Sequence, residues 1–278
     1  MSGRPYARIP GSEPSVTTII GDMLAKPGLP WAAARETALF AVHHQDEWAD
    51  LSPDQAVERL RRHHRGVWDS RAAMGTALHA VNEAWCRGAV VDLGDLVVGL
   101  IDTERTARMW AGREDEIVSS LDGYVAGLER FWDAWAPSTV RSEYCVRQAG
   151  VYVGTADWLA DVSGRRLVLD LKTTAQPDAE RGVYHDSWAL QLAAYRWAPE
   201  RVEYGDPAAG GPPTEIAGGP NEAADGAAVV LLRGDGEFSF FEVDASREMH
   251  QAFMWLANAR SRLRALPVPA PILPGVAA

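Results

Sequence analysis

The residues best suited to chemistry are two aspartates and a lysine near the middle of the chain. Asp170 and Lys172 are two residues apart in an alternating apolar run, so a strand there would place both side chains on one face. Asp157 lies on a preceding predicted strand, joined by a tight turn at 163–164, and could meet them across the hairpin. This arrangement suits a divalent-metal site for phosphodiester hydrolysis. The alternative is an ordinary surface pair at a solvated strand edge.

Further polar side chains fall on predicted helices before and after this hairpin. A helix over 68–87 would place His79 and Glu83 four residues apart on a shared face. After the hairpin, Gln191 and Tyr195 lie one turn apart on another predicted helix. A single helical histidine is usually structural or exposed, so His79 alone is a weak indication of a site.

The order of the predicted elements indicates an α/β fold with a mixed central β-sheet. Helices predominate in the first half of the chain, and three strands, a helix, two strands and a final helix follow. The predicted helices cover 31–44, a segment from 53 onward, 68–87, 114–135, 187–197 and 246–265. The predicted strands cover 140–147, 151–161, 165–173, 227–233 and 237–243.

These patterns predict three parts of the chain. A helical N-terminal region would cover 1–136 and a core domain 137–266, followed by a disordered Pro/Ala-rich tail over 267–278. Within the core, residues 199–226 lack periodicity and indicate a long connection, with a short strand near 202–204.

Composition narrows the function classes. The formal net charge of -11 argues against a generic nucleic-acid coat, which would be basic. It does not exclude an enzyme that acts on nucleic acid, because metal-binding carboxylates also count as negative charges. No run of 18 apolar residues and no secretory signal is present, so we expect a cytoplasmic protein without a membrane partner.

The most basic stretch is a predicted helix with four arginines: Arg59, Arg61, Arg62 and Arg65. In one interpretation they contact DNA phosphates, which would make the affinity for DNA strongly dependent on salt. In the other they form a solvated helix face.

Four short motifs in order resemble the RecB-like, Cas4-like branch of the PD-(D/E)xK nuclease superfamily, which includes phage-encoded exonucleases. The motifs are Gly75–His79, Gly154–Asp157, Leu169–Thr173 and Gln191–Tyr195. The resemblance implies a restriction-endonuclease-like core with a mixed central β-sheet flanked by helices. It also implies a metal-dependent DNA exonuclease in recombination, repair or phage DNA processing. The alternative is a catalytically inactive nuclease-fold protein that binds DNA or serves in assembly.

The expected metal is Mg²⁺ or Mn²⁺. Asp157 and Asp170 would supply carboxylates, and the backbone carbonyl of Leu171 could add a third oxygen. By the resemblance, His79 would reach the metal from its helix, and an imidazole ligand favours Mn²⁺.

The remaining candidate residues would support the reaction. Lys172 would orient or activate the attacking water, and Gln191 and Tyr195 would orient Lys172 or contact the scissile region. Glu143, on the first predicted strand, is either an extra acidic residue of the site or a surface residue. Glu83 is a possible partner for the His79 imidazole.

The chain departs from some relatives in its cysteines and partners. Cas4 proteins carry four cysteines for an iron–sulfur cluster, whereas this chain has only Cys86 and Cys145, so no cluster is predicted. Helicase motifs are absent, so unwinding would need a partner. Besides DNA, the candidate partners are a recombinase, a single-strand annealing protein, a helicase or further copies of the chain. If the protein is phage-encoded, the host cytoplasm is the expected location.

Overall fold

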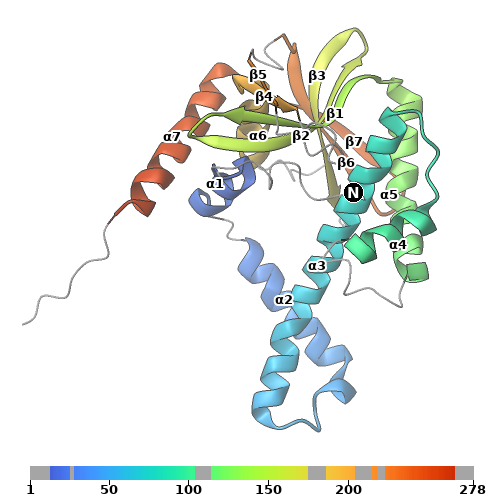
Figure 1. Cartoon of the computed structure of the whole chain (residues 1–278). Coiled ribbons are helices and arrows are strands. Elements are labelled where there is room, and N and C mark those ends of the chain that lie inside the picture. The colour runs from blue at the N-terminus through green and yellow to red at the C-terminus, as the bar shows by residue number, and fades with distance from the viewer. Residues whose placement is uncertain are drawn as a thin grey trace, which may run out of the picture.

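The structure is a computed structural model that describes residues 13–25, 28–103, 114–174, 186–203, 214–217 and 223–266. The helices (Figure 1) are α1 (Val16–Met23), α2 (Gly28–His43), η2 (Gln45–Glu47, a short 3-10 helix), α3 (Pro53–Cys86), α4 (Leu93–Thr103), α5 (Glu114–Trp135), α6 (Asp186–Arg196) and α7 (Arg247–Arg264). The strands are β1 (Ser138–Gln148), β2 (Tyr152–Val162), β3 (Arg165–Thr174), β4 (Glu200–Glu203), β5 (Thr214–Ala217), β6 (Gly226–Arg233) and β7 (Phe238–Val243). The predicted tail over 267–278 lies outside the described residues.

The described strands form one mixed sheet in the order β5-β4-β1-β2-β3-β6-β7. β3 and β6 run parallel, whereas all other neighbours run antiparallel. The parallel pair requires a crossover, and α6, β4 and β5 lie along the chain between its two strands. With helices on both faces, this sheet confirms the predicted α/β class and is consistent with a restriction-endonuclease-like fold.

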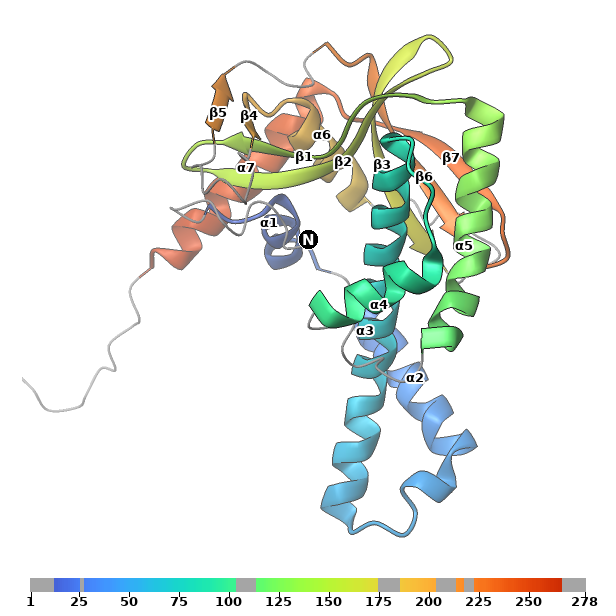
Figure 2. The same ribbon diagram turned by 45° about the vertical axis from the view of Figure 1, so that its right-hand side comes forward.

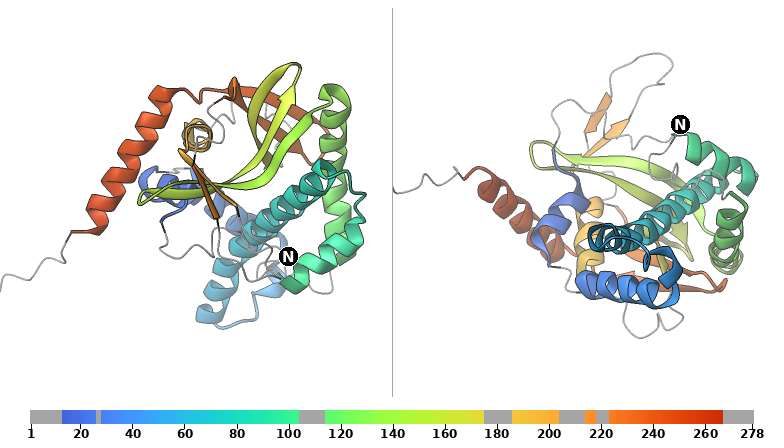
Figure 3. Two further views of the ribbon diagram at one scale, coloured as in Figure 1. Left: turned by 45° about the horizontal axis from the view of Figure 1, so that its top comes forward. Right: turned by 90° about the horizontal axis from the view of Figure 1, so that it is seen from below.

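Helices cover both faces of the sheet, as the views in Figure 3 show. Buried residues of α1, α6 and α7 form one core cluster with the sheet, and those of α3, α4 and α5 form another. Along β3, Leu169 and Leu171 join the α3–α5 cluster, while Val168 joins the other. Because side chains alternate along a strand, Asp170 and Lys172 point to the α6 side.

α3 is one continuous helix of 34 residues where the sequence predicted two helices. Ser52 caps its start in a capping box with Gln55, and Pro53 occupies the first turn. The interior Gly66 and Gly75 each cost roughly 1 kcal/mol relative to alanine, which is too little to end the helix. With α2, the N-terminal half of α3 forms an arm that projects from the body (Figures 1 and 2).

The β2–β3 hairpin has a two-residue turn in which both residues adopt left-handed backbone conformations. Ser163 has φ of 49° and Gly164 has φ of 79°. Turns of this kind match the twist of the flanking strands and fix their register. In that register Trp158 pairs with Leu169, and Val162 pairs with Arg165.

The N-terminal helices do not all lie apart from the sheet. α1 buries Val16, Ile19 and Ile20 in the same core cluster as α6 and α7. The boundary between a helical N-terminal region (1–136) and a core domain (137–266) therefore stays a prediction from the sequence. None of the described helices has the length and apolar character needed to cross a lipid bilayer.

The described part of the predicted connection over 199–226 contains more strand than expected. β4 covers the predicted short strand near 202–204 in part, and β5 pairs with it at the edge of the sheet. β5 was missed because Thr214 and Glu215 are polar and a four-residue edge strand carries little apolar periodicity.

Candidate active site

Asp157 and Asp170 are neighbours on β2 and β3. Because Trp158 pairs with Leu169, the two aspartates occupy facing positions of the hairpin. Asp157 is 8% exposed and Asp170 is 1% exposed. Asp157 Oδ2 accepts a hydrogen bond of 2.8 Å from the backbone N–H of Leu171. Two buried carboxylates at this position need nearby positive charge, because they disfavour each other's ionised form.

Lys172 and α6 provide the partners of Asp170. Lys172 Nζ forms an ion pair with Asp170 Oδ2, and Gln191 Nε2 donates to Asp170 Oδ1 at 2.9 Å. Gln191 Oε1 also accepts from Lys172 Nζ at 3.5 Å, and Gln191 Nε2 lies 3.2 Å from the hydroxyl of Tyr195. The amide of Gln191 thus holds the carboxylate and the ammonium together, and Tyr195 contacts that amide.

His79 reaches the same site from α3. Its Nδ1 lies 3.1 Å from Glu143 Oε1 and 3.7 Å from Asp157 Oδ2. Ligand atoms of His79, Glu143 and Asp157 all lie within 4.8 Å of one another. The structure therefore brings together residues from α3, β1 and β2 that are up to 78 positions apart in the chain.

Glu143 has an unusual backbone conformation for a strand residue. Its φ is 45°, in the left-handed region, although its neighbours Ser142 and Tyr144 pair regularly with β2. Such strained non-glycine residues cluster at functional sites, where the surrounding structure maintains them. Its contact with His79 favours the interpretation of Glu143 as an acidic residue of the site over a surface residue.

Two other candidates have different surroundings. Glu83 forms an ion pair with Arg87 at 3.1 Å, so Glu143, rather than Glu83, is the acid that contacts the imidazole. Leu171 is 2% exposed, and its N–H is the group that contacts Asp157. Metal ligation by the Leu171 carbonyl stays a prediction.

The predicted DNA-binding arginines lie on the arm, away from these residues. Arg59 pairs with Glu47, while Arg61 and Arg62 both pair with Glu58. The side chain of Arg65 lies outside the described residues. At 1.5 Å per residue, Arg59 is about 30 Å along α3 from His79. Their contact with DNA stays a prediction, and any phosphate would have to compete with these carboxylates.

The charges at the site depend on burial and on mutual attraction. Burial raises the pKa of Asp157 and raises that of Asp170 to about 6, and the Lys172 ammonium only partly offsets the effect on Asp170. Burial alone would lower the pKa of His79, but Asp157 and Glu143 outweigh it and raise that pKa to about 9. Asp170 and Asp157 likewise outweigh burial and raise the pKa of Lys172. At neutral pH, protonated His79 and Lys172 therefore neutralise much of the carboxylate charge.

The donor set fits a divalent cation. Carboxylate oxygens are the ligands that Mg²⁺ and Mn²⁺ prefer, and one imidazole shifts the preference toward Mn²⁺. Asp157 lies within reach of both His79 and Glu143 and faces Asp170 across the hairpin. A cation at this position would replace the positive charge that the His79 proton now supplies.

The two motif glycines differ in their surroundings. A Cβ on Gly154 would lie 2.6 Å from Cε1 of Tyr195, so only glycine lets the tyrosine ring pack against β2. A Cβ on Gly75 would meet no heavy atom of the described residues within 4 Å. Both glycines belong to the sequence motifs, but the sequence could not show that Gly154 lies against the ring of Tyr195.

Comparisons with known proteins place most of the chain within one family model. The family model of the PD-(D/E)XK nuclease superfamily matches residues 55–267, a span that contains all the site residues above. No curated protein matches the chain. Among solved structures, a crystal structure of SSO0001 is similar with 16% sequence identity and a TM-score of 0.33, covering 70% of this chain and 86% of that chain.

Proposed function

Because the chain belongs to the PD-(D/E)XK nuclease superfamily, whose members use divalent metals, we propose that it is a Mg²⁺- or Mn²⁺-dependent DNA exonuclease. The observation that carries the proposal is the convergence of Asp157, Asp170 and Lys172 with His79 and Gln191 from four elements. Each charged group of this set has a partner of opposite charge within the set. Such preorganised charge is suited to phosphodiester hydrolysis.

In the proposed reaction the protein side chains position water, phosphate and metal. His79, Asp157 and Asp170 would hold the metal, which when bound supplies Lewis-acid activation of water and stabilisation of the leaving oxygen. Lys172, as a cation, would donate hydrogen bonds to the attacking water or a phosphate oxygen. Gln191 would keep Lys172 in place, because its amide contacts both Lys172 and Asp170.

Our proposals for the branch of the superfamily and for the biological process rest on the order of the four sequence motifs. That order supports placement in the RecB-like, Cas4-like branch and a role in recombination, repair or phage DNA processing. We also propose that the protein acts in the cytoplasm, of the host cell if it is phage-encoded, where Cys86 and Cys145 would stay reduced. A recombinase, an annealing protein or a helicase would then supply or receive its DNA.

A cleavage assay on linear and covalently closed circular DNA tests the proposal. We expect degradation of linear DNA with Mg²⁺ or Mn²⁺, none with EDTA, and no cleavage of the closed circles. Asp170→Asn and Lys172→Met should each reduce the rate by at least about 10²-fold, because each removes a group at the reacting centre.

The matched control is Asp161→Asn in the same β2–β3 hairpin. Asp161 is partly exposed and forms an ion pair with Arg166. It should leave the cleavage rate unchanged. Cleavage of closed circles would contradict the exonuclease mode alone. Full activity of the Asp170→Asn protein, or activity in EDTA, would contradict the metal-dependent site itself.

A further inference from the structure

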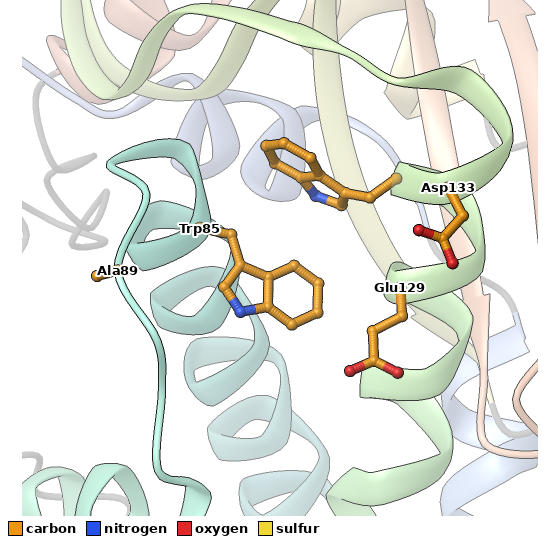
Figure 4. Close-up of a pocket in the computed structure, with 5 residues that line it drawn as sticks. Trp85, Ala89, Glu129 and Asp133 are labelled. Carbon is orange, nitrogen blue, oxygen red and sulfur yellow. The ribbon is translucent and has the colours of Figure 1, made fainter.

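A second site lies between the C-terminal end of α3 and the C-terminal part of α5. A pocket of about 430 Å³ is lined by Trp85 and Ala89 on one side and by Glu129, Trp132 and Asp133 of α5 on the other. Figure 4 shows Trp85 facing Glu129, with Asp133 one turn further along the same helix. None of these residues belongs to the candidate active site.

The aromatic walls of the pocket are preorganised. The rings of Trp85 and Trp132 lie 6.3 Å apart at an interplanar angle of 86°, so they form two walls of a corner. Trp132 stacks on the fully buried Trp158 at 5.1 Å, and its Nε1 donates to Asn82 Oδ1 at 3.1 Å. Since Asn82 is itself buried, the Trp132 ring is held from two directions and needs no rearrangement to receive a ligand.

The other walls of the pocket carry two carboxylates, those of Glu129 and Asp133. Glu129 and Asp133 are exposed and one helical turn apart, an arrangement in which like charges repel. Among the described residues neither has an ion-pair partner, because the neighbouring Arg130 pairs with Glu237 and Arg87 pairs with Glu83. The pocket therefore combines indole faces with two carboxylates whose charge is not balanced within the described part of the chain.

This chemistry selects one kind of ligand. Indole faces attract cations, and tryptophan does so best among aromatic residues. A guanidinium is planar, stacks on aromatic rings and donates two parallel hydrogen bonds to a carboxylate. DNA is disfavoured, because Glu129 and Asp133 would repel its phosphates. Beside Ala89 at the rim, Val90 is 99% exposed and offers contact to an apolar residue next to the cation.

We propose that this pocket binds an arginine side chain of a partner protein, within a short segment that also carries apolar residues. The cation would lie against Trp85 and Trp132 and bind to Glu129 and Asp133. The partner would thus have a basic docking segment, complementary to a chain of net charge -11. The site is independent of the proposed cleavage of DNA, because it shares no residue with the catalytic set.

A peptide titration of the full-length protein tests this proposal. The probe is acetyl-Leu-Arg-Leu-amide, compared with the same peptide carrying citrulline, a neutral analogue of arginine, or lysine. Binding is followed by the NMR signals of the Trp85 and Trp132 indole N–H groups, assigned with Trp85→Phe and Trp132→Phe. We expect saturable shifts of both signals, with affinity at least tenfold weaker for citrulline and also weaker for lysine.

Two protein variants test whether the negative charges of Glu129 and Asp133 contribute to peptide binding. Glu129→Gln/Asp133→Asn should reduce the affinity at least tenfold, while leaving cleavage of DNA unchanged. Asp115→Asn/Asp122→Asn removes the same charge from exposed positions of the same helix and should bind as the unmodified protein does. Equal affinity for arginine and citrulline would overturn the proposal. So would unchanged binding by Glu129→Gln/Asp133→Asn, equal shifts with oligothymidylate, or no shift up to about 10 mM peptide.

Discussion

Replacement of Gly154 by alanine should disturb the active site through Tyr195. The new Cβ would lie 2.6 Å from Tyr195 Cε1 and 3.2 Å from Val16 Cγ2. Ordinary carbon contacts begin at about 3.5 Å, so the ring must move by roughly 1 Å. Tyr195 is 3% exposed and packed in the core, which leaves little room for that movement.

The expected effect has a stability part and an activity part. Overpacking a core of this kind costs about 1–3 kcal/mol, partly offset because alanine reduces the entropy of the unfolded chain relative to glycine. Tyr195 contacts Gln191, which holds Asp170 and Lys172, so a displaced ring should also move these proposed catalytic groups. A misplacement of about 1 Å can reduce kcat by roughly 10²-fold.

Thermal unfolding and single-turnover cleavage at saturating Mn²⁺ measure the two parts. The matched control is Gly75→Ala in the first motif, because a Cβ there meets no atom of the described residues. In a helix that change should stabilise the fold by up to about 1 kcal/mol. Gly154→Ala should instead lower both Tm and kcat.

A double-mutant cycle isolates the contact with the tyrosine ring. In a Tyr195→Ala background the ring is absent, so Gly154→Ala should cost at least about 1 kcal/mol less than in the unmodified protein. Equal costs in the two backgrounds would refute the reasoning, since the need for glycine at position 154 would then have another origin.

Three further predictions concern packing and charge. Gly123→Ala should destabilise the fold by about 1–3 kcal/mol in chemical denaturation, because its Cβ would lie 1.9 Å from the Gly234 carbonyl oxygen. In the proposed site a metal displaces the His79 proton, and the pKa of His79 is raised to about 9, so Mn²⁺ affinity should rise up to tenfold per pH unit between about 7 and 9. Calorimetry should show that the rise of Mn²⁺ affinity with pH is lost in His79→Ala. Asp170, with its pKa raised to about 6, is already ionised between about pH 7 and 9 and does not contribute to that rise. In the metal-free protein, Glu143→Gln should lower the pKa of His79 in an NMR titration, and an unchanged pKa would contradict the pairing.

Much of the site follows from local sequence patterns. Alternation along β3 places Asp170 and Lys172 on one face, whatever the rest of the fold does. The turn at Ser163 and Gly164 fixes the hairpin register, and that register sets Asp157 beside Asp170. These relations were predictable because they depend on strand geometry and turn conformation over about twenty residues.

Tertiary packing decided the contacts between distant segments. The contact of His79 with Glu143 joins residues 64 positions apart, and it depends on how α3 packs on the sheet and on a strained residue within β1. The sequence likewise could not show that Glu47 and Glu58 pair with the arm arginines, or that Trp85 and Trp132 form a pocket with two carboxylates. Periodicity specifies which face of an element is apolar, but the neighbour across the core depends on the packing of all elements together.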